Sequence, residues 1–151
     1  MLPESKPHLY ESIIRNFILA YNRFDVEGML KDVHNDVVFK HISGGETLHT
    51  TRGREALRKQ AQEAITYFSK REQQITSIKI EGNRVTADIE FSGLLANDMP
   101  DENRVNEAIT SAGQSIYTFK HDKIIEINDI SQYGGAGTPS SRTGTNQSTE
   151  P

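Results

Sequence analysis

The sequence predicts a single α+β domain in which helices pack on one face of a curved sheet. Apolar residues recur every three or four positions near the N-terminus and again over about 54–68, which is typical of amphipathic helices. From about residue 78 they alternate with polar residues, as in half-buried antiparallel strands. The length of 151 residues, with 34% hydrophobic and 25% charged residues, fits one soluble domain.

Two helices are expected first. An amphipathic helix over about 8–23 is predicted by the apolar stripe of Leu9, Ile13, Ile14, Phe17, Ile18, Tyr21 and Phe24. Asp25 has the residue type of an N-cap and precedes a short second helix that runs through Leu30, with Glu27 in its first turn.

A β-hairpin over 37–52 follows, with the turn at Gly44-Gly45. The third helix, over about 54–68, places Leu57, Ala61 and Phe68 on one stripe. Four antiparallel strands then close the domain. The segments 78–81 and 85–92 form one hairpin, 97–107 is a polar loop, and 109–120 pairs with 123–131 across a tight turn.

The last residues, 134–151, are rich in Gly, Ser and Thr and are predicted to be disordered, because they cannot bury enough apolar surface. We expect residues 1–7 to be flexible and 8–133 to form the one domain. The N-terminal segment has no apolar stretch after a basic head, so a signal peptide is not expected. A cytoplasmic location is therefore predicted.

The composition excludes several classes of function. The net charge of −4 argues against nucleic acid or an anionic membrane as the main partner, because both bind basic patches. The absence of cysteine excludes disulfides, thiolate zinc sites and cysteine nucleophiles. No apolar run approaches the ~20 residues that span a bilayer.

Four stretches of sequence, in this order, resemble the nuclear transport factor 2-like superfamily and its SnoaL-like and ketosteroid-isomerase-like branch. They are YNRFDVEG at 21–28, VVF at 37–39, RGREAL at 52–57 and YTFKHDKIIE at 117–126. The resemblance covers about 9–132 and implies a cone in which a strongly bent antiparallel sheet wraps around three helices and leaves a deep pocket. Such folds serve isomerases, cyclases, dehydratases, epoxide hydrolases and non-catalytic binding domains, so fold does not settle function.

The resemblance also argues against ketosteroid isomerase activity. Phe17 stands where that enzyme has its oxyanion-hole tyrosine, His41 where it has the base aspartate, and Ser115 where it has the hydrogen-bonding aspartate. A phenyl ring cannot donate a hydrogen bond, so the main oxyanion donor is missing.

The same positions suggest a different site. The resemblance places His41 at the pocket, and alternation along the last strand puts Asp129 on the face of Ile127 that would look into it. We therefore hypothesise that His41 is a general base, Asp129 orients it, and Tyr21 donates its hydroxyl to a small hydrophobic substrate. Isomerisation, dehydration or cyclisation without a cofactor would fit. The expected lining residues are Phe17, Phe39, Phe91, Ser115, Tyr117 and Ile127.

Plainer interpretations stay open. His41 can be an exposed residue beside a turn, Asp129 a partner of a cation, and Tyr21 a core aromatic. The protein would then be a non-catalytic ligand-binding or dimerisation domain. The resemblance implies a homodimer through the sheet face, which here includes Lys79, Glu81, Thr86, Asp88 and Glu90.

A metal site is not expected. The turn at Gly44-Gly45 would pair position 41 with 48 and position 40 with 49. Because directly paired residues share a face, His41 and His49 would then point to opposite sides of the hairpin.

Overall fold

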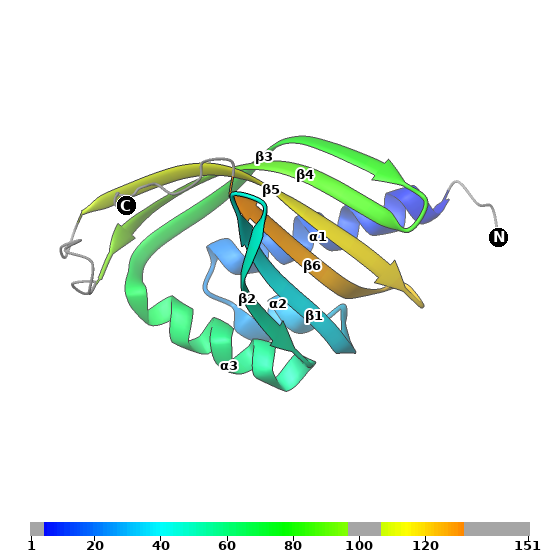
Figure 1. Cartoon of the computed structure of the whole chain (residues 1–151), viewed down its shortest axis with the longest axis horizontal. Coiled ribbons are helices and arrows are strands. Elements are labelled where there is room, and N and C mark those ends of the chain that lie inside the picture. Colours follow the sequence, from blue (N-terminus) through cyan, green and yellow to red (C-terminus); the bar gives the residue numbers. More distant parts are fainter. Residues whose placement is uncertain (1–4, 97–106, 132–151) are drawn as a thin grey trace.

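The computed structural model describes residues 5–96 and 107–131, and Figure 1 shows their arrangement. The helices are α1 (Ser5–Asn22), α2 (Val26–Leu30) and α3 (Arg54–Ala64), and α3 continues into a short 3₁₀ turn (Ile65–Tyr67). The strands are β1 (Val33–Ser43), β2 (Glu46–Arg52), β3 (Phe68–Glu81), β4 (Arg84–Leu95), β5 (Ala108–Lys120) and β6 (Lys123–Ser131). The predicted α+β class is confirmed.

The six strands form one curled sheet in the order β2-β1-β6-β5-β4-β3, with the helices on one side of it (Figure 1). Neighbouring strands within the described residues are antiparallel, except that β1 and β6 run parallel. The expectation of a wholly antiparallel sheet is therefore wrong at this one pair. A parallel pair needs a long connection, and the chain from β2 through α3 to β5 provides it.

Helix α1 begins at Ser5, so residues 5–7 are helical although the sequence predicted a flexible segment over 1–7. Pro7 is accommodated because backbone N–H groups in the first turn of a helix have no helical partner. The Lys6 ammonium donates to both carboxylate oxygens of Asp122, at 2.6 and 2.7 Å, and so ties the start of α1 to the turn between β5 and β6. Residues 1–4 lie outside the described residues.

Helix α2 begins as predicted. The side chain of Asp25 accepts a hydrogen bond from the backbone N–H of Gly28 at 2.9 Å, which satisfies one of the free donors of the first turn. Val26, Met29 and Leu30 are buried, so the cap positions a helix that contributes to the core.

Replacing Asp25 by alanine removes this cap. We expect the free energy of unfolding, measured by urea denaturation, to fall by ~1 kcal/mol. The control is Asp36→Ala, since Asp36 is an exposed carboxylate on β1 outside any helix. An equal loss in both variants would show that general charge, and not the cap, is responsible.

The β1–β2 hairpin has a different register from the one predicted. Gly44-Gly45 forms the turn with positive φ angles of 60° and 81°, as expected. The pairing then slips by one residue at Leu48, and His41 lies opposite His49. Because directly paired residues share a face, the prediction that these two histidines point to opposite sides is wrong. The reason is the β-bulge, which no turn signal in the sequence marks.

Helix α3 ends at Ala64, four residues before the predicted end, and Phe68 already belongs to β3. The first half of β3 is a strand that the sequence did not reveal. Arg71, Gln73 and Ile75 are at least half-buried there, whereas Glu72 and Gln74 between them are exposed. Burial alternates with a period of two, as in other strands. The sequence does not show this alternation as a hydrophobic pattern, because two of the inward residues are polar.

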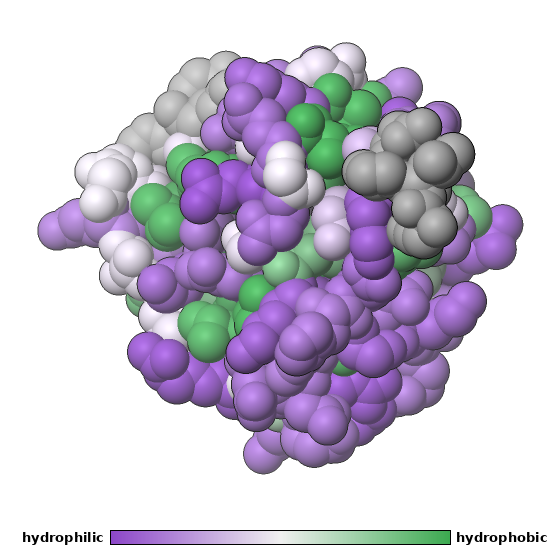
Figure 2. Space-filling model, turned by 90° about the vertical axis from the view of Figure 1, so that its right-hand side faces the viewer, coloured by the Kyte–Doolittle hydropathy of each residue, from purple (hydrophilic) through white to green (hydrophobic). Residues whose placement is uncertain are grey.

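The core lies between α1 and the inner face of the sheet. Its fully buried side chains come from every layer: Ile14, Leu30, Val37, Val85, Tyr117, Phe119 and Ile124. The side of the molecule shown in Figure 2 is mostly hydrophilic, with hydrophobic residues in small separate patches. In the part of the chain that the structure describes, no helix is long and apolar enough to cross a membrane.

Two further predictions cannot be followed in the structure. The segment 134–151, predicted to be disordered, lies outside the described residues, and so does the loop predicted over 97–107, apart from its last residue.

Candidate functional site

A cavity of about 210 Å³ lies between the helices and the inner face of the sheet, and we call it the inner cavity. Most of its lining is aromatic or aliphatic: Phe17, Met29, Phe39, Leu57, Ala61, Ala64, Tyr117 and Ile127. The remaining lining residues are polar: Tyr21, Gln60, Arg71, Gln73 and Asp129. An apolar chamber with a few convergent polar groups is the usual form of a small-molecule site.

A second space of about 240 Å³, the outer hollow, adjoins the first and is more open. Tyr21, Gln73 and Asp129 line both spaces, so they stand at the junction. His41 lines only the outer hollow. A ligand in the inner cavity would therefore meet Asp129 directly, with His41 on the outer side of that carboxyl.

Asp129 is the centre of a row across three strands. On β1 its neighbour in register is His41, and on β5 it is Ser115. The Ser115 hydroxyl donates to Oδ1 of Asp129 at 2.7 Å. Among the described residues, the carboxylate has neither a hydrogen bond nor an ion pair with His41. Asp129 is thus held by Ser115, a partner that the sequence hypothesis did not assign to it.

Burial raises the pKa of the Asp129 carboxyl above its ordinary value, because the charged form loses solvation. The hydrogen bond from Ser115 and the nearby His41 act in the opposite direction but do not cancel the effect. A carboxylate with a raised pKa is a stronger base than an exposed one, and such groups cluster at functional sites.

The raised pKa has a consequence for stability. The folded state binds the proton of Asp129 more tightly than the unfolded state, so this group destabilises the fold increasingly as pH rises above the ordinary value of 3.8. The stability of Asp129→Asn relative to the parent should therefore increase with pH from about 4 and level off. Urea denaturation across this range measures it. A difference that shrinks or stays constant would contradict the raised pKa.

Tyr21 lies in the last turn of α1 and faces the junction. Burial raises the pKa of its hydroxyl to about 12, with Asp129 adding to the effect and Arg71 opposing it. At neutral pH the hydroxyl is therefore protonated and able to donate. Its ring contacts the guanidinium of Arg71 at 3.7 Å from Cζ to the centroid, and it meets Phe91 edge-on at 6.5 Å.

The other residues expected at a pocket also lie at these spaces. Phe17, Phe39, Tyr117 and Ile127 line the inner cavity, and the rings of Phe17 and Tyr117 pack edge to face at 5.8 Å. Phe91 and Ser115 line the outer hollow. Phe17, which the resemblance aligned with the oxyanion-hole tyrosine of ketosteroid isomerases, contributes an apolar ring to the cavity wall. The roles of these residues stay predictions.

Sequence reasoning missed Arg71, Gln73 and Gln60. The alternation of Arg71, Gln73 and Ile75 could have indicated a strand with these residues on one face. Because two of the three are polar, sequence analysis assigns that face to solvent unless a cavity is known to lie beneath it. Gln60 on α3 contacts the ring of His49, with Nε2 and Oε1 3.0 Å apart. No group of three or more His, Asp or Glu within 5–96 and 107–131 is placed to hold a metal ion.

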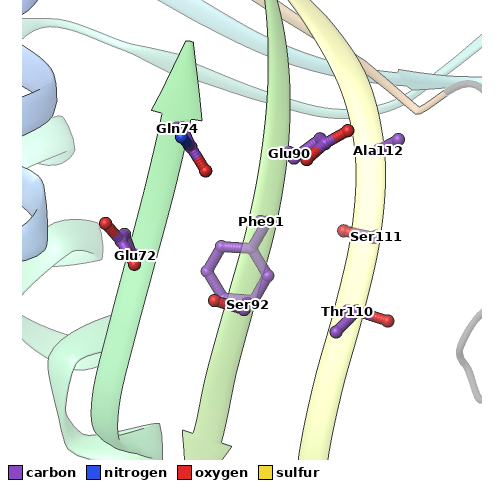
Figure 3. A pocket seen from close by; sticks show the side chains of 8 residues that line it. All are labelled: Glu72, Gln74, Glu90, Phe91, Ser92, Thr110, Ser111 and Ala112. Carbon is purple, nitrogen blue, oxygen red and sulfur yellow. The ribbon is translucent and has the colours of Figure 1, made fainter. Parts of the chain in front are cut away.

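A groove of about 380 Å³ crosses β3, β4 and β5, and Figure 3 shows the side chains that line it. They are mostly polar, with Glu72 and Glu90 both present. The groove is more open than the inner cavity. We therefore place the candidate site at the inner cavity and its junction with the outer hollow.

Solved structures share this architecture. A candidate SnoaL-like polyketide cyclase from Jannaschia sp. CCS1 superposes with a TM-score of 0.71 at 9% identity, covering 83% of this chain and 86% of that one. An LEH-like epoxide hydrolase of M. tuberculosis superposes with a TM-score of 0.64 at 12% identity, covering 80% of this chain and 80% of that one. TerC, co-crystallised with polyporic acid, superposes with a TM-score of 0.65 at 16% identity, covering 82% of this chain and 92% of that one. At these identities the likeness concerns the fold.

No curated protein matches the sequence. Residues 14–127 match the family described as the SnoaL-like domain, and this region includes every residue that lines the inner cavity except Asp129. The protein therefore belongs to the SnoaL-like domain family.

Proposed function

We propose that the inner cavity binds a small, largely apolar organic molecule. Its volume of about 210 Å³ exceeds the ~150 Å³ of an apolar protein cavity that holds benzene. A ligand with a single ring or with two fused rings is therefore a reasonable size. The aromatic lining supports the choice of a ring compound. A fold neighbour, TerC, was co-crystallised with polyporic acid, which is in line with an organic ligand.

The proposed chemistry is proton transfer at a carbon beside a carbonyl group. The carboxylate of Asp129 removes the proton, the bonding electron pair becomes the enolate, and the hydroxyl of Tyr21 donates a hydrogen bond to the enolate oxygen. Return of the proton to another carbon gives an isomer and restores the carboxylate. The observation that carries this proposal is the position of Asp129, a carboxyl with a raised pKa that lines both spaces.

This assignment changes the role first given to His41. The sequence hypothesis made His41 the base, but it lines only the outer hollow, whereas Asp129 faces the inner cavity. In the proposal His41 exchanges protons between Asp129 and solvent, a role for which imidazole is suited near neutral pH.

The test uses 2-tetralone as a probe, because it is a two-ring ketone with exchangeable protons beside its carbonyl. Proton NMR in D₂O would follow the loss of these signals with and without the protein. Faster exchange that saturates with 2-tetralone supports the proposal. Saturable binding without faster exchange would favour the non-catalytic ligand-binding alternative, and absence of binding would contradict the proposed ligand class.

We also propose a homodimer through the outer face of the sheet. Thr86 and Asp88 are half-buried and Glu90 is exposed, and all three lie on the opposite side of β4 from the buried Ala87 and Ile89. A polar face of this kind is compatible with a wet interface. Light scattering over a range of concentrations should give twice the chain mass, and a constant monomer mass would contradict it.

A further inference from the structure

Arg71 is a buried cation with an unused donor. Its side chain is only 6% exposed although arginine is among the residues least often buried. Nε donates to the backbone carbonyl of Tyr21 at 2.9 Å, and the guanidinium lies over the rings of Tyr21 and Phe24. Nη2 is buried and has no hydrogen-bond partner among the described residues.

No carboxylate compensates this charge. Within 5–96 and 107–131 no Asp or Glu forms an ion pair with Arg71. Burial accordingly lowers the pKa of the guanidinium, which reflects the cost of its lost solvation. A buried donor without a partner is costly, and a charged one more so. An anion that binds at Nη2 would remove that cost.

The position of Arg71 fits a ligand-binding role. It lines the inner cavity from β3, while Asp129 lines it from β6, and two strands separate them in the sheet. Tyr21 lies near both, since its hydroxyl interacts electrostatically with Arg71 and with Asp129. The cavity therefore has a cationic end at Arg71 and a proton-transfer end at Asp129.

We propose that the ligand is an organic acid whose carboxylate is bound by Nη2 of Arg71 while its apolar rings fill the inner cavity. This inference rests on the proposed function and narrows its substrate class to ring compounds that carry a carboxylate at one end. The proton to be transferred would lie at the other end, beside Asp129.

The test compares two probes of equal shape and different charge, 2-naphthoate and 2-naphthamide, by isothermal titration calorimetry. The parent protein should bind the naphthoate about tenfold or more tightly, as expected for a buried hydrogen bond to a charged group. In Arg71→Met this preference should disappear, while the affinity for the naphthamide stays within about twofold of the parent. Lys59→Met is the control, since it removes an equally charged, exposed side chain of α3 that lines neither the inner cavity nor the groove beside Arg71 and lies outside the proposed dimer face.

Arg71 also borders an open groove that includes Leu19 and Phe24, so the location of the anion is tested separately. Ala64→Phe fills the inner cavity, which Ala64 lines, and leaves that groove unchanged. We expect it to weaken the binding of both probes. Unchanged naphthoate binding in this variant would place the anion in the groove and overturn the inference.

Arg71→Met also removes the contacts of Arg71 with Tyr21, so a second variant guards against a folding defect. Arg71→Lys keeps the charge and should retain a preference for the naphthoate. A parent protein that binds both probes equally, or an Arg71→Met variant that keeps the preference, overturns the inference and leaves the proposed ligand class intact. A parent that binds neither probe contradicts the proposed ligand class as well.

Discussion

Replacement of Asp129 by asparagine is expected to slow the exchange of 2-tetralone protons by about 10²- to 10⁴-fold, the usual contribution of a general acid or base. Asparagine has the same shape and accepts the hydrogen bond from Ser115, but it cannot take up the proton. Binding of the ketone should change little, because the apolar lining is untouched. Proton NMR in D₂O measures both the rate and its saturation.

Asp88→Asn provides a matched control for the carboxyl group. Because Asp88 lies on the proposed dimer face, light scattering checks that this variant keeps the mass of the parent. Asp88 also accepts a hydrogen bond from a serine hydroxyl, that of Ser77, at 2.7 Å, and lines none of the spaces around Asp129. Its hydrogen bonds lower the pKa of its carboxyl, in contrast to Asp129. Equal exchange rates in the parent and in Asp129→Asn would show that the carboxyl does not transfer the proton.

Phe119→Ala should cause the largest loss of stability. The ring is 2% exposed and stacks on Tyr10 with centroids 4.1 Å apart, so it connects β5 to α1. Its removal leaves a space that the surrounding sheet cannot close, and such substitutions cost about 3–5 kcal/mol. Urea denaturation measures the loss as a lower midpoint.

Leu48→Ala is the comparison for this variant. Leu48 is also large and apolar, but it is 60% exposed at the bulge of β2. We expect a change within about 0.5 kcal/mol, as for most surface substitutions. Similar losses in the two variants would mean that Phe119 does not occupy the core as described.

The fold was predictable where hydrophobic periodicity meets a clear turn signal. The hairpin at Gly82-Asn83 and the amphipathic stripe of α1 are of this kind, and both are present. The start of β3 was not predictable, because its inward residues, such as Arg71, are polar. The parallel pairing of β1 with β6 depends on contacts between residues far apart in the chain, and local sequence patterns carry no information about such contacts.

The site was predictable in part, for a related reason. Alternation along the last strand pointed to Asp129, which lines the inner cavity, while helical spacing pointed to Tyr21. The hydrogen bond between Ser115 and Asp129 joins two strands in a register that one sequence does not specify. For Arg71, only the folded chain reveals that a residue with the pattern of a surface cation is buried beside a cavity.

The central claim is that Asp129 is a partly desolvated carboxyl in contact with the bound ligand. The most direct test is a ¹³C NMR titration of its carboxyl carbon, assigned with Asp129→Asn, in the absence and presence of saturating 2-naphthamide. We predict a pKa above the ordinary value of 3.8, and a further change when the ligand binds. A pKa at or below that value, or one that the ligand leaves unchanged, would contradict the account.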